Sequence, residues 1–360
     1  MTLRFGVIGT SWMNTFHMRT INSHDRANVH AICGRDAGKA AKVAAENDVP
    51  HVHTDYGELI DRGDLDAVVI GTPDHLHHEM VLRAAAAGLH VVCEKPLAQS
   101  LEQAREMAQA VESAGRNGMT FYTYGWLPHY QRLKQLSQEY VGRILSADFK
   151  YLTPGVPEDS AYDWHYDPRL GTGILGNLAS HVIYLAGAIV GDIESVAAMT
   201  AVQFNRLGET NADVEQLPDS VTMVVRYAGG ALGSIQAGYS VAPGGQEQLV
   251  TIHGEEGTLQ ASLDDPGGIQ LRGGRSGDDL ALIAGTDDLW DGIDLSQDQQ
   301  ERFIEYYTSR PVGIRRFIDD IHSDTPSRPS LQDGVRVQAV LEAARLSAQT
   351  GRTQDVVQIN

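Results

Sequence analysis

The segment GVIGTSWMNTFH, residues 6–17, contains the residue types that hold a phosphate group. Gly9 stands at the first position of the G-x-G-x-x-G fingerprint, whose glycines let the backbone approach the pyrophosphate of a dinucleotide. Ser11 and Asn14 replace the second and third glycines, but small polar residues at a helix N-terminus still offer N–H groups and a hydroxyl to a phosphate. An ordinary strand-to-helix turn is the alternative. We predict phosphate contacts from five consecutive residues: Gly9, Thr10, Ser11, Trp12 and Met13.

A second pair, Gly34-Arg35, ends the next apolar run about 25 residues after Gly9, where an acid would bind the ribose 2′-hydroxyl of NAD. Gly34 at that position removes a charge that would repel a 2′-phosphate. Arg35 can donate a charge-assisted, bidentate hydrogen bond to such a phosphate. The pair favours NADP(H) as cofactor. NAD is the alternative if Arg35 points into solvent and Asp36 contacts the adenosine side.

Alternating strand-like and helix-like segments position these residues. From residue 3 to about 123, apolar runs alternate with segments of helical period, which is typical of βαβ units and a parallel sheet. We predict a doubly wound Rossmann domain, with α/β architecture, over residues 1–124. Its expected strands are Arg4–Ile8, Val29–Cys33, Ala67–Gly71, His90–Cys93 and Met119–Tyr122, with helices near 12–23, 36–47, 75–87 and 100–115.

The second half of the chain has a different pattern. From about Arg143, segments such as ILSADFKYL, SVTMVVRY, ALGSIQAGY and EQLVTIHG alternate with a period of two, which indicates half-buried antiparallel strands. Helices are expected over roughly 173–190, 312–323 and 331–349, and the Gly- and Asp-rich stretches 264–279 and 284–298 are predicted as long surface loops. We predict an α+β domain over residues 125–360 with a large, open, mostly antiparallel sheet, whose C-terminal helices could pack back on the first domain.

Composition limits the kinds of partner. The chain has 360 residues and a formal net charge of −19, and it contains no run of Lys or Arg. Nucleic acids and anionic membranes require a basic surface, so we expect neither as a partner. No segment approaches ~18 consecutive apolar residues, and the N-terminus enters a strand directly without a secretory signal. We expect a soluble, cytoplasmic protein that binds a small molecule, with Cys33 and Cys93 as reduced core residues.

Three further motifs are more specific than the degenerate glycine loop. They are the first strand-to-helix turn ending in His17, the segment VVIGTPDHLHHEMVLRAAAAGLHVVCEKPLA, and the block GTGILGNLASHVIYLAGAIVG. Over nearly its whole length the chain resembles the family of glucose-fructose oxidoreductase, inositol dehydrogenase and MocA. The resemblance implies a dehydrogenase or reductase that acts on a sugar, inositol or related polyol.

The resemblance also implies roles for the turn at Thr72, Pro73 and Asp74, which follows a strand end and would line the nicotinamide. His77 would pack or form a hydrogen bond near the cofactor. The cluster of His75, His77 and His78 could suggest a metal site, but these residues begin a helix and point in different directions. We expect no metal.

In the Glu94-Lys95-Pro96 motif, the resemblance places the lysine beside the nicotinamide and the reacting carbon of the substrate. The Lys95 ammonium could stabilise the charge of a developing alkoxide or polarise a carbonyl. Glu94 would orient or pair with Lys95, and Pro96 would fix the turn.

The later block implies a proton carrier, because the family pattern has an acid four residues before a histidine, one helical turn apart. The corresponding residues here are Asn177 and His181. His181 suits a general base or acid, with a hydrogen-bonded core histidine as the alternative. An amide at Asn177 cannot exchange a proton, although it can form hydrogen bonds with a sugar hydroxyl, and its neutrality is expected to lower the pKa of His181.

Further departures surround this site. Tyr184 stands where the family often has Asp, Ala179 where Gly is common, and Gly125 where Arg is frequent. These changes suggest an altered substrate or, as the alternative, lost catalysis.

The substrate pocket is expected to include aromatic residues, because aromatic rings stack on the apolar faces of sugars. Several of them could instead belong to the core. The candidates are Tyr124, Trp126, Tyr162, Trp164, His165 and Arg169, together with Asn177 and His181.

The resemblance further implies a homo-oligomer, dimer or tetramer, formed through the open face of the C-terminal sheet. Two alternatives to an NADP(H)-dependent dehydrogenase remain open. One is a catalytically impaired NADP-binding sensor or scaffold, suggested by Ser11, Asn14 and Asn177. The other is a lyase or hydrolase that uses a tightly held cofactor for transient oxidation.

Overall fold

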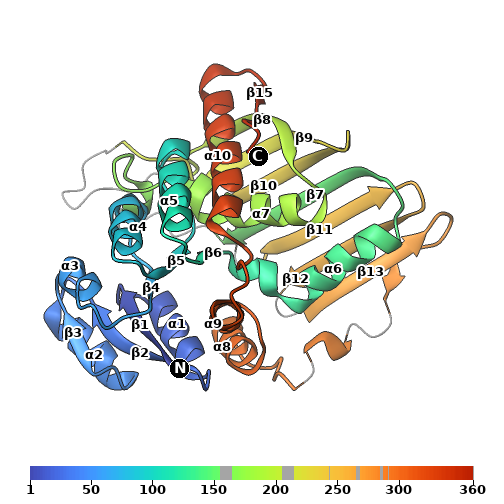
Figure 1. The fold of residues 1–360 in the computed structure, drawn as a ribbon. Coiled ribbons are helices and arrows are strands. Elements are labelled where there is room, and N and C mark those ends of the chain that lie inside the picture. Colours follow the sequence, from blue (N-terminus) through green and yellow to red (C-terminus); the bar gives the residue numbers. More distant parts are fainter. Residues whose placement is uncertain are drawn as a thin grey trace. The chain divides into compact units, whose positions relative to one another are not determined.

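A computed structural model describes residues 1–154, 164–204, 215–242, 244–264, 268–283, 287–290 and 292–359. The chain divides into two units (Figure 1). The first comprises Met1–Phe121 and Gly292–Val335, and the second comprises Tyr122–Asp291 and Arg336–Asn360. Tyr162, a predicted substrate residue, lies outside the described residues.

The first unit contains a six-stranded parallel sheet with the strand order β3-β2-β1-β4-β5-β6. The predicted doubly wound sheet is thus confirmed. All four residues of β4 are buried, as expected for a strand that is covered on both faces. The strands are β1 (Leu3–Ile8), β2 (Ala27–Cys33), β3 (His51–His53), β4 (Ala67–Ile70), β5 (His90–Glu94) and β6 (Gly118–Phe121).

Polar side chains begin most helices of this unit. Ser11, Asp36, Asp55 and Ser100 each accept a backbone N–H in the first turn of the helix that follows. Such caps satisfy donors that have no partner within the helix. The helices are α1 (Trp12–Asn22), α2 (Ala37–Glu46), α3 (Tyr56–Ile60), α4 (His77–Ala86) and α5 (Leu101–Ser113), with a 3-10 turn at Asp74–Leu76 before α4.

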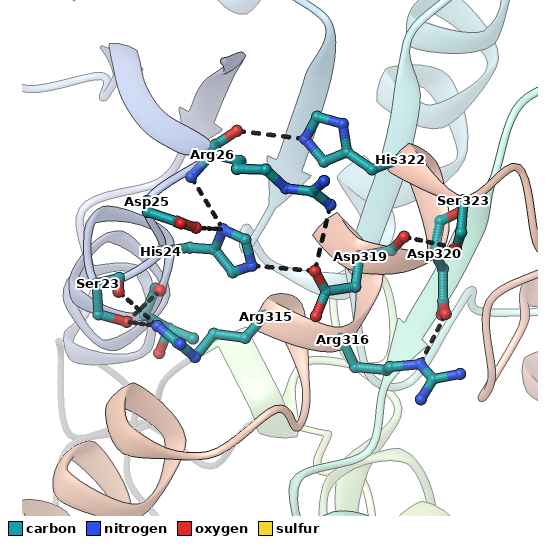
Figure 2. A network of polar contacts seen from close by, with 11 residues as sticks. Ser23, His24, Asp25, Arg26, Arg315, Arg316, Asp319, Asp320, His322 and Ser323 are labelled. Atoms are coloured by element: carbon teal, nitrogen blue, oxygen red, sulfur yellow. Dashed lines mark hydrogen bonds and ion pairs between the residues drawn. The ribbon is translucent and has the colours of Figure 1, made fainter. Parts of the chain in front are cut away.

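Two helices from late in the chain complete this unit, α8 (Gln299–Ser309) and α9 (Ile314–His322), and both contact α1. Figure 2 shows the polar network that joins α9 to the end of α1. His24 Nε2 lies 3.3 Å from Asp319 Oδ1, and Arg315 donates to the hydroxyl of Ser23 at 2.9 Å. These contacts join residues almost 300 positions apart in the sequence.

The second unit contains a nine-stranded sheet with the order β14-β13-β12-β11-β7-β10-β9-β8-β15. Only the β7–β10 pairing is parallel among the described pairings, so the predicted mostly antiparallel sheet is confirmed. The strands are β7 (Ile144–Pro154), β8 (Ile193–Ala201), β9 (Ser220–Tyr227), β10 (Leu232–Val241), β11 (Glu247–Gly254), β12 (Gly257–Asp264), β13 (Gly268–Arg275), β14 (Ala281–Leu282) and β15 (Gln354–Asp355).

One face of this sheet is covered by α6 (Pro128–Glu139) and α7 (Ser180–Ile189). On the opposite face, the side chains of Met199 and Val224 are 80% and 57% exposed. The long helix α10 (Leu331–Thr350) continues from the first unit into the second, where the Ser347 hydroxyl accepts the N–H of Ala198 on β8 at 2.9 Å.

The prediction of a long surface loop over 264–279 is wrong, because β13 occupies half of that stretch and pairs with β12. The glycines that suggested a loop permit close packing instead. A Cβ on Gly273 would lie 3.1 Å from Leu259 Cδ2 and 3.3 Å from Tyr140 Cε1. The second predicted loop, over 284–298, contains a 3-10 turn at Asp287–Trp290 in its described part.

Cys33 and Cys93 are both buried and unpaired, as predicted. Among the described helices, none combines the length and apolar character of a membrane span.

Candidate active site

The loop between β1 and α1 has the geometry of an anion-binding cradle. Gly9 has a φ of +121°, and a Cβ there would collide with the Gly71 carbonyl oxygen, so a larger residue would not fit. Ser11 caps α1 by accepting the N–H of Asn14. Within the described residues, no hydrogen bond takes the N–H of Trp12 or Met13. These donors face the position that a phosphate takes at a helix N-terminus.

Asn14, at the third glycine position, is fully buried. Its amide nitrogen donates to the Ser11 hydroxyl at 2.9 Å and to the Gly71 carbonyl at 2.8 Å. The Asn14 side chain therefore ties the loop to the end of β4, which explains how the loop is held without the consensus glycine. Its Oδ1 atom is buried without a partner in the described part of the chain.

The end of β2 carries the residues expected to select the cofactor. Gly34 is buried, and a Cβ there would lie 2.5 Å from Thr10 Cγ2. Arg35 is exposed, and its guanidinium has no ion pair within the described residues. The Asp36 carboxylate caps α2 by accepting the N–H of Lys39 at 2.9 Å. Arg35 is therefore available to an anion, whereas Asp36 already has a role in the helix.

His77, the first residue of α4, lies between the turn after β4 and the turn after β5. Its Nε2 is 2.9 Å from the Thr72 carbonyl oxygen and its Nδ1 is 3.0 Å from the Pro96 carbonyl oxygen. The ring is fully buried. His77 thus bridges the turn after β4 and the turn after β5, while the Thr72 hydroxyl lies 3.6 Å from the sulfur of Met80.

Lys95 follows β5 directly and is partly buried. Burial lowers the pKa of its ammonium, while the nearby carboxylates of Glu94 and Asp74 oppose this shift. Glu94 contacts the backbone of Lys95 and also His17, a partner that the sequence did not indicate. Its Oε1 lies 2.6 Å from His17 Nε2, and its Oε2 accepts the N–H of Lys95 at 3.2 Å.

In the second unit, Asn177 and His181 lie on the predicted helix, whose first part, Leu175–Ala179, is π-helical. Such π-segments occur often at functional sites. The Asn177 amide donates to the Tyr239 hydroxyl at 2.7 Å, a partner that the sequence did not indicate. His181 is buried.

Aromatic side chains surround His181. The ring of Tyr124 lies edge-on at 4.8 Å, and the Tyr124 hydroxyl is 2.5 Å from that of Tyr151. Gln248 donates to the Tyr124 hydroxyl at 3.5 Å. Burial raises the pKa of both phenols, so both are protonated at neutral pH. A small cavity in this unit is lined by His181, Tyr124, Tyr151 and Gln248, among others.

Gly125 and Tyr184, two departures from the family pattern, lie in direct contact. The ring of Tyr184 stacks on Tyr122 with centroids 4.4 Å apart and planes 4° apart. A Cβ on Gly125 would lie 3.2 Å from Tyr184 Cδ1 and would collide with Cε1 of the same ring. The tyrosine therefore occupies the volume that a side chain at position 125 would need.

The other predicted substrate residues are placed as follows. Trp164 and His165 stack with ring centroids 3.7 Å apart, and Trp126 is half-buried in the 3-10 turn Thr123–Trp126. Arg169 is exposed and forms two hydrogen bonds with the Asp167 carboxylate, at 3.0 and 2.6 Å. No cluster of three metal-ligating side chains was found among the described residues.

Two sequence profiles match the chain. "Oxidoreductase family, NAD-binding Rossmann fold" matches residues 3–122, and "Oxidoreductase family, C-terminal alpha/beta domain" matches residues 133–359. The chain belongs to the Gfo/Idh/MocA oxidoreductase family. The suspected resemblance is confirmed.

Relatives within the Gfo/Idh/MocA family are named for sugar and polyol substrates. Levoglucosan dehydrogenase of Pseudarthrobacter phenanthrenivorans is 32% identical over 240 residues, 61% of each chain. Inositol 2-dehydrogenase 2 of Saccharopolyspora erythraea is 28% identical over 372 residues, covering 99% of this chain and 96% of the relative. The solved structure "Levoglucosan dehydrogenase, complex with NADH and levoglucosan" has a TM-score of 0.89 at 26% identity, with both chains fully covered.

Proposed function

We propose that this protein is an NADP(H)-dependent oxidoreductase that transfers hydride between nicotinamide and a secondary hydroxyl or ketone of a sugar, inositol or related polyol. The observation that carries the proposal is the partly buried Lys95 at the carboxyl end of β5, where open parallel sheets bind ligands. Membership of the Gfo/Idh/MocA family supports it.

Two side chains are proposed to act on the substrate, Lys95 and His181. A bound nicotinamide cofactor would supply the acceptor or donor of the hydride. Lys95 would donate a hydrogen bond to the substrate oxygen and stabilise negative charge there as the hydroxyl is oxidised. His181 would take the hydroxyl proton, or return it to the ketone oxygen in reduction.

The cofactor preference is argued from Gly34 and Arg35. The buried glycine brings no carboxylate to the position of the 2′-group, and the exposed guanidinium has no acidic partner within the described residues. A bidentate arginine suits a phosphate better than a hydroxyl. NAD is the alternative, and the levoglucosan dehydrogenase structures contain NADH.

The substrate class is argued from the second unit. Phenol, amide and imidazole groups lie there among aromatic rings, at Tyr124, Asn177, Tyr239 and His181. Hydrogen-bonding groups beside apolar rings fit the hydroxyls and the C–H faces of a sugar or polyol. Asn177 would hold a substrate hydroxyl without exchanging a proton.

A homo-oligomer is also proposed, formed through the open face of the nine-stranded sheet. Met199, Val224 and Leu232 are exposed on β8, β9 and β10. An apolar group on an uncovered sheet face favours association with another copy.

The test of the proposed function combines binding with turnover. NADPH and NADH are titrated by fluorescence, and a panel of inositols, anhydrosugars and aldoses is then assayed at 340 nm. We expect tighter binding of NADPH, a loss of that preference in Arg35→Ala, and turnover that Lys95→Ala abolishes while cofactor affinity is largely retained. NADH binding with negligible NADPH binding would refute the Arg35 argument. Cofactor binding without turnover on any substrate would favour a sensor.

A further inference from the structure

His17 has no exposed surface, yet its side chain connects two elements of the first unit. It lies in the second turn of α1, and its Nε2 is 2.6 Å from Glu94 Oε1 at the end of β5. The other Glu94 oxygen accepts the N–H of Lys95 at 3.2 Å. The Glu94 carboxylate therefore joins helix α1 to Lys95.

The surroundings of His17 fix its ring. Phe121 lies perpendicular to it at a centroid distance of 4.6 Å, and Phe16 packs at 5.4 Å. A hydrogen bond between a buried imidazole and a carboxylate is strong in such apolar surroundings, and the loss of one partner leaves the other costly to bury. Glu94 is itself only 8% exposed, so water does not readily replace His17.

Asn14 lies three residues before His17, on the same face of α1. Its amide donates to the Gly71 carbonyl at the end of β4. Two side chains of α1 thus bond to the ends of two neighbouring strands. The cradle at the start of α1 and the turn that carries Lys95 are held by one helix.

We propose that His17 is a positioning residue that acts through Glu94 on the turn carrying Lys95. His17 holds the Glu94 carboxylate, which in turn fixes the Lys95 backbone and places negative charge beside the ammonium. This inference deepens the proposed function and rests on it only for the role of Lys95 toward substrate.

Other charged and titratable groups face the same turn. The Asp74 carboxylate also acts on the Lys95 ammonium, and the His77 ring contacts the Pro96 carbonyl. Asp74 and His77 are unchanged in every variant of the test, so the variants compare the His17–Glu94 pair against the same background.

The test uses the full-length protein and three substitutions in the pair. His17→Leu keeps the volume and removes the hydrogen bond, His17→Gln keeps an N–H donor near the position of Nε2, and Glu94→Gln removes the charge. The matched control is His24→Leu. His24 is 7% exposed and contacts Asp319 just beyond the far end of α1 (Figure 2), so the control loses a buried histidine–carboxylate contact remote from Lys95.

The direct readout is the titration of Lys95. The chain has five lysines, Lys39, Lys42, Lys95, Lys134 and Lys150, so NMR of protein labelled with [ε-13C]lysine yields few signals, and Lys95→Arg assigns the one of interest. We expect the Lys95 titration to move to lower pH in Glu94→Gln. The same direction is expected in His17→Leu, because the Glu94 carboxylate is then no longer held beside the ammonium. His17→Gln is expected to restore the midpoint, and His24→Leu to leave it unchanged.

Turnover provides the second readout. We expect kcat of His17→Leu to fall about tenfold or more, since misplacement of a reacting group by about 1 Å can cost on the order of 10²-fold, and kcat of His17→Gln to recover in part. An unchanged Lys95 titration in His17→Leu, or equal shifts in His17→Leu and His24→Leu, would overturn the proposal. The titration needs no substrate, so it remains decisive if the proposed reaction itself proves wrong.

Discussion

At the residue scale, Gly125 and Tyr184 show how two neighbouring changes depend on one another. Tyr184 stacks on Tyr122, and its ring edge occupies the position of a Cβ at residue 125. The stacked ring cannot move away without losing its contact with Tyr122. The two departures from the family pattern are therefore a single exchange of polar groups for aromatic packing.

Gly125→Ala is expected to destabilise the protein by about 1–3 kcal/mol, the usual cost of overpacking a filled site. The added methyl group would collide with Cε1 of Tyr184. Thermal unfolding of the single variants and of the double variant with Tyr184→Ala measures the coupling. Because Tyr184→Ala removes the ring, Gly125→Ala should cost little in that background. An equal cost in both backgrounds would contradict the shared-space argument.

Asn177 is the residue at which a change should alter the chemistry most directly. In Asn177→Asp, a carboxylate one turn before His181 would stabilise the imidazolium and raise the pKa of His181. Since alcohol oxidation needs the neutral ring, the rising limb of kcat against pH is expected to move to higher pH. Asn177→Gln serves as a neutral control. A pH profile shared by all three proteins would exclude His181 as the proton carrier.

The sequence predicted many of these residues but few of their partners. Lys95, His181 and Asn177 stand out because short motifs surround them. Tyr239 and Asn177 are hydrogen-bonded although 62 positions separate them in the sequence, and His17 and Glu94 although 77 positions separate them. No local sequence pattern indicates either pair. Such pairings depend on which strand ends and helices become neighbours, which residue spacing alone does not determine.

At the element scale, helix α1 compensates for the degenerate glycine loop. Asn14 fills the space between Gly9 and Gly71. Its amide donates to the Ser11 hydroxyl in the loop and to the Gly71 carbonyl after β4. The consensus glycine at position 14 would leave that space empty. The loop departs from the fingerprint, yet its conformation is fixed.

Asn14→Gly restores the fingerprint but is expected to weaken the protein. Two hydrogen bonds are lost at about 1 kcal/mol each, and a glycine in a helix costs about 1 kcal/mol more. We expect a lower melting temperature and weaker NADPH binding by fluorescence titration. Asn22→Gly, at the last position of the same helix, is the control: it also loses two side-chain hydrogen bonds but lies away from the cradle, so it should lower stability without weakening NADPH binding. Tighter NADPH binding in Asn14→Gly would show that the side chain obstructs the cradle.

Strand β13 shows why composition misled at this scale. Its sequence GIQLRGGR suggests a loop, but β12 offers a strand edge and Leu259 packs where a side chain at position 273 would lie. Glycine in a strand often marks such close approach. The Arg275 guanidinium then lies 4.7 Å from the centre of the Tyr140 ring, an attraction that supports the strand end. Alternating strands such as β9 and β11 were predictable because each buries one face.

At the scale of the whole molecule, two observations concern how the chain is assembled. Residues 292–335 join the first unit, and the contact of His24 with Asp319 is part of that attachment. In the second unit, the face of the nine-stranded sheet opposite α6 and α7 is uncovered at Met199 and Val224. The sequence indicated an open sheet by its period of two, but only the register brings Val224 opposite Ala197 and Ser234.

Val224→Asp is expected to weaken the proposed oligomer, because a carboxylate would be buried without a partner at the interface. Light scattering after size-exclusion chromatography measures the mass. Leu145→Asp introduces the same charge at an exposed position of β7 that alternates to the helix-covered side, and should leave the mass unchanged. A wild-type protein that is monomeric at assay concentration would disprove association through this face.

The stacking of Tyr184 over Gly125 also restricts the order in which these two residues can be acquired. With any side chain at position 125, the present rotamer of Tyr184 collides with it, so the tyrosine could not settle there first. For any ancestor with a larger residue at 125, a glycine at 125 is therefore expected to have arisen before the tyrosine or together with it, and reversion at 125 to be unfavourable once the ring is in place. In a series of reconstructed ancestral sequences, glycine at 125 is therefore expected to appear no later than tyrosine at 184.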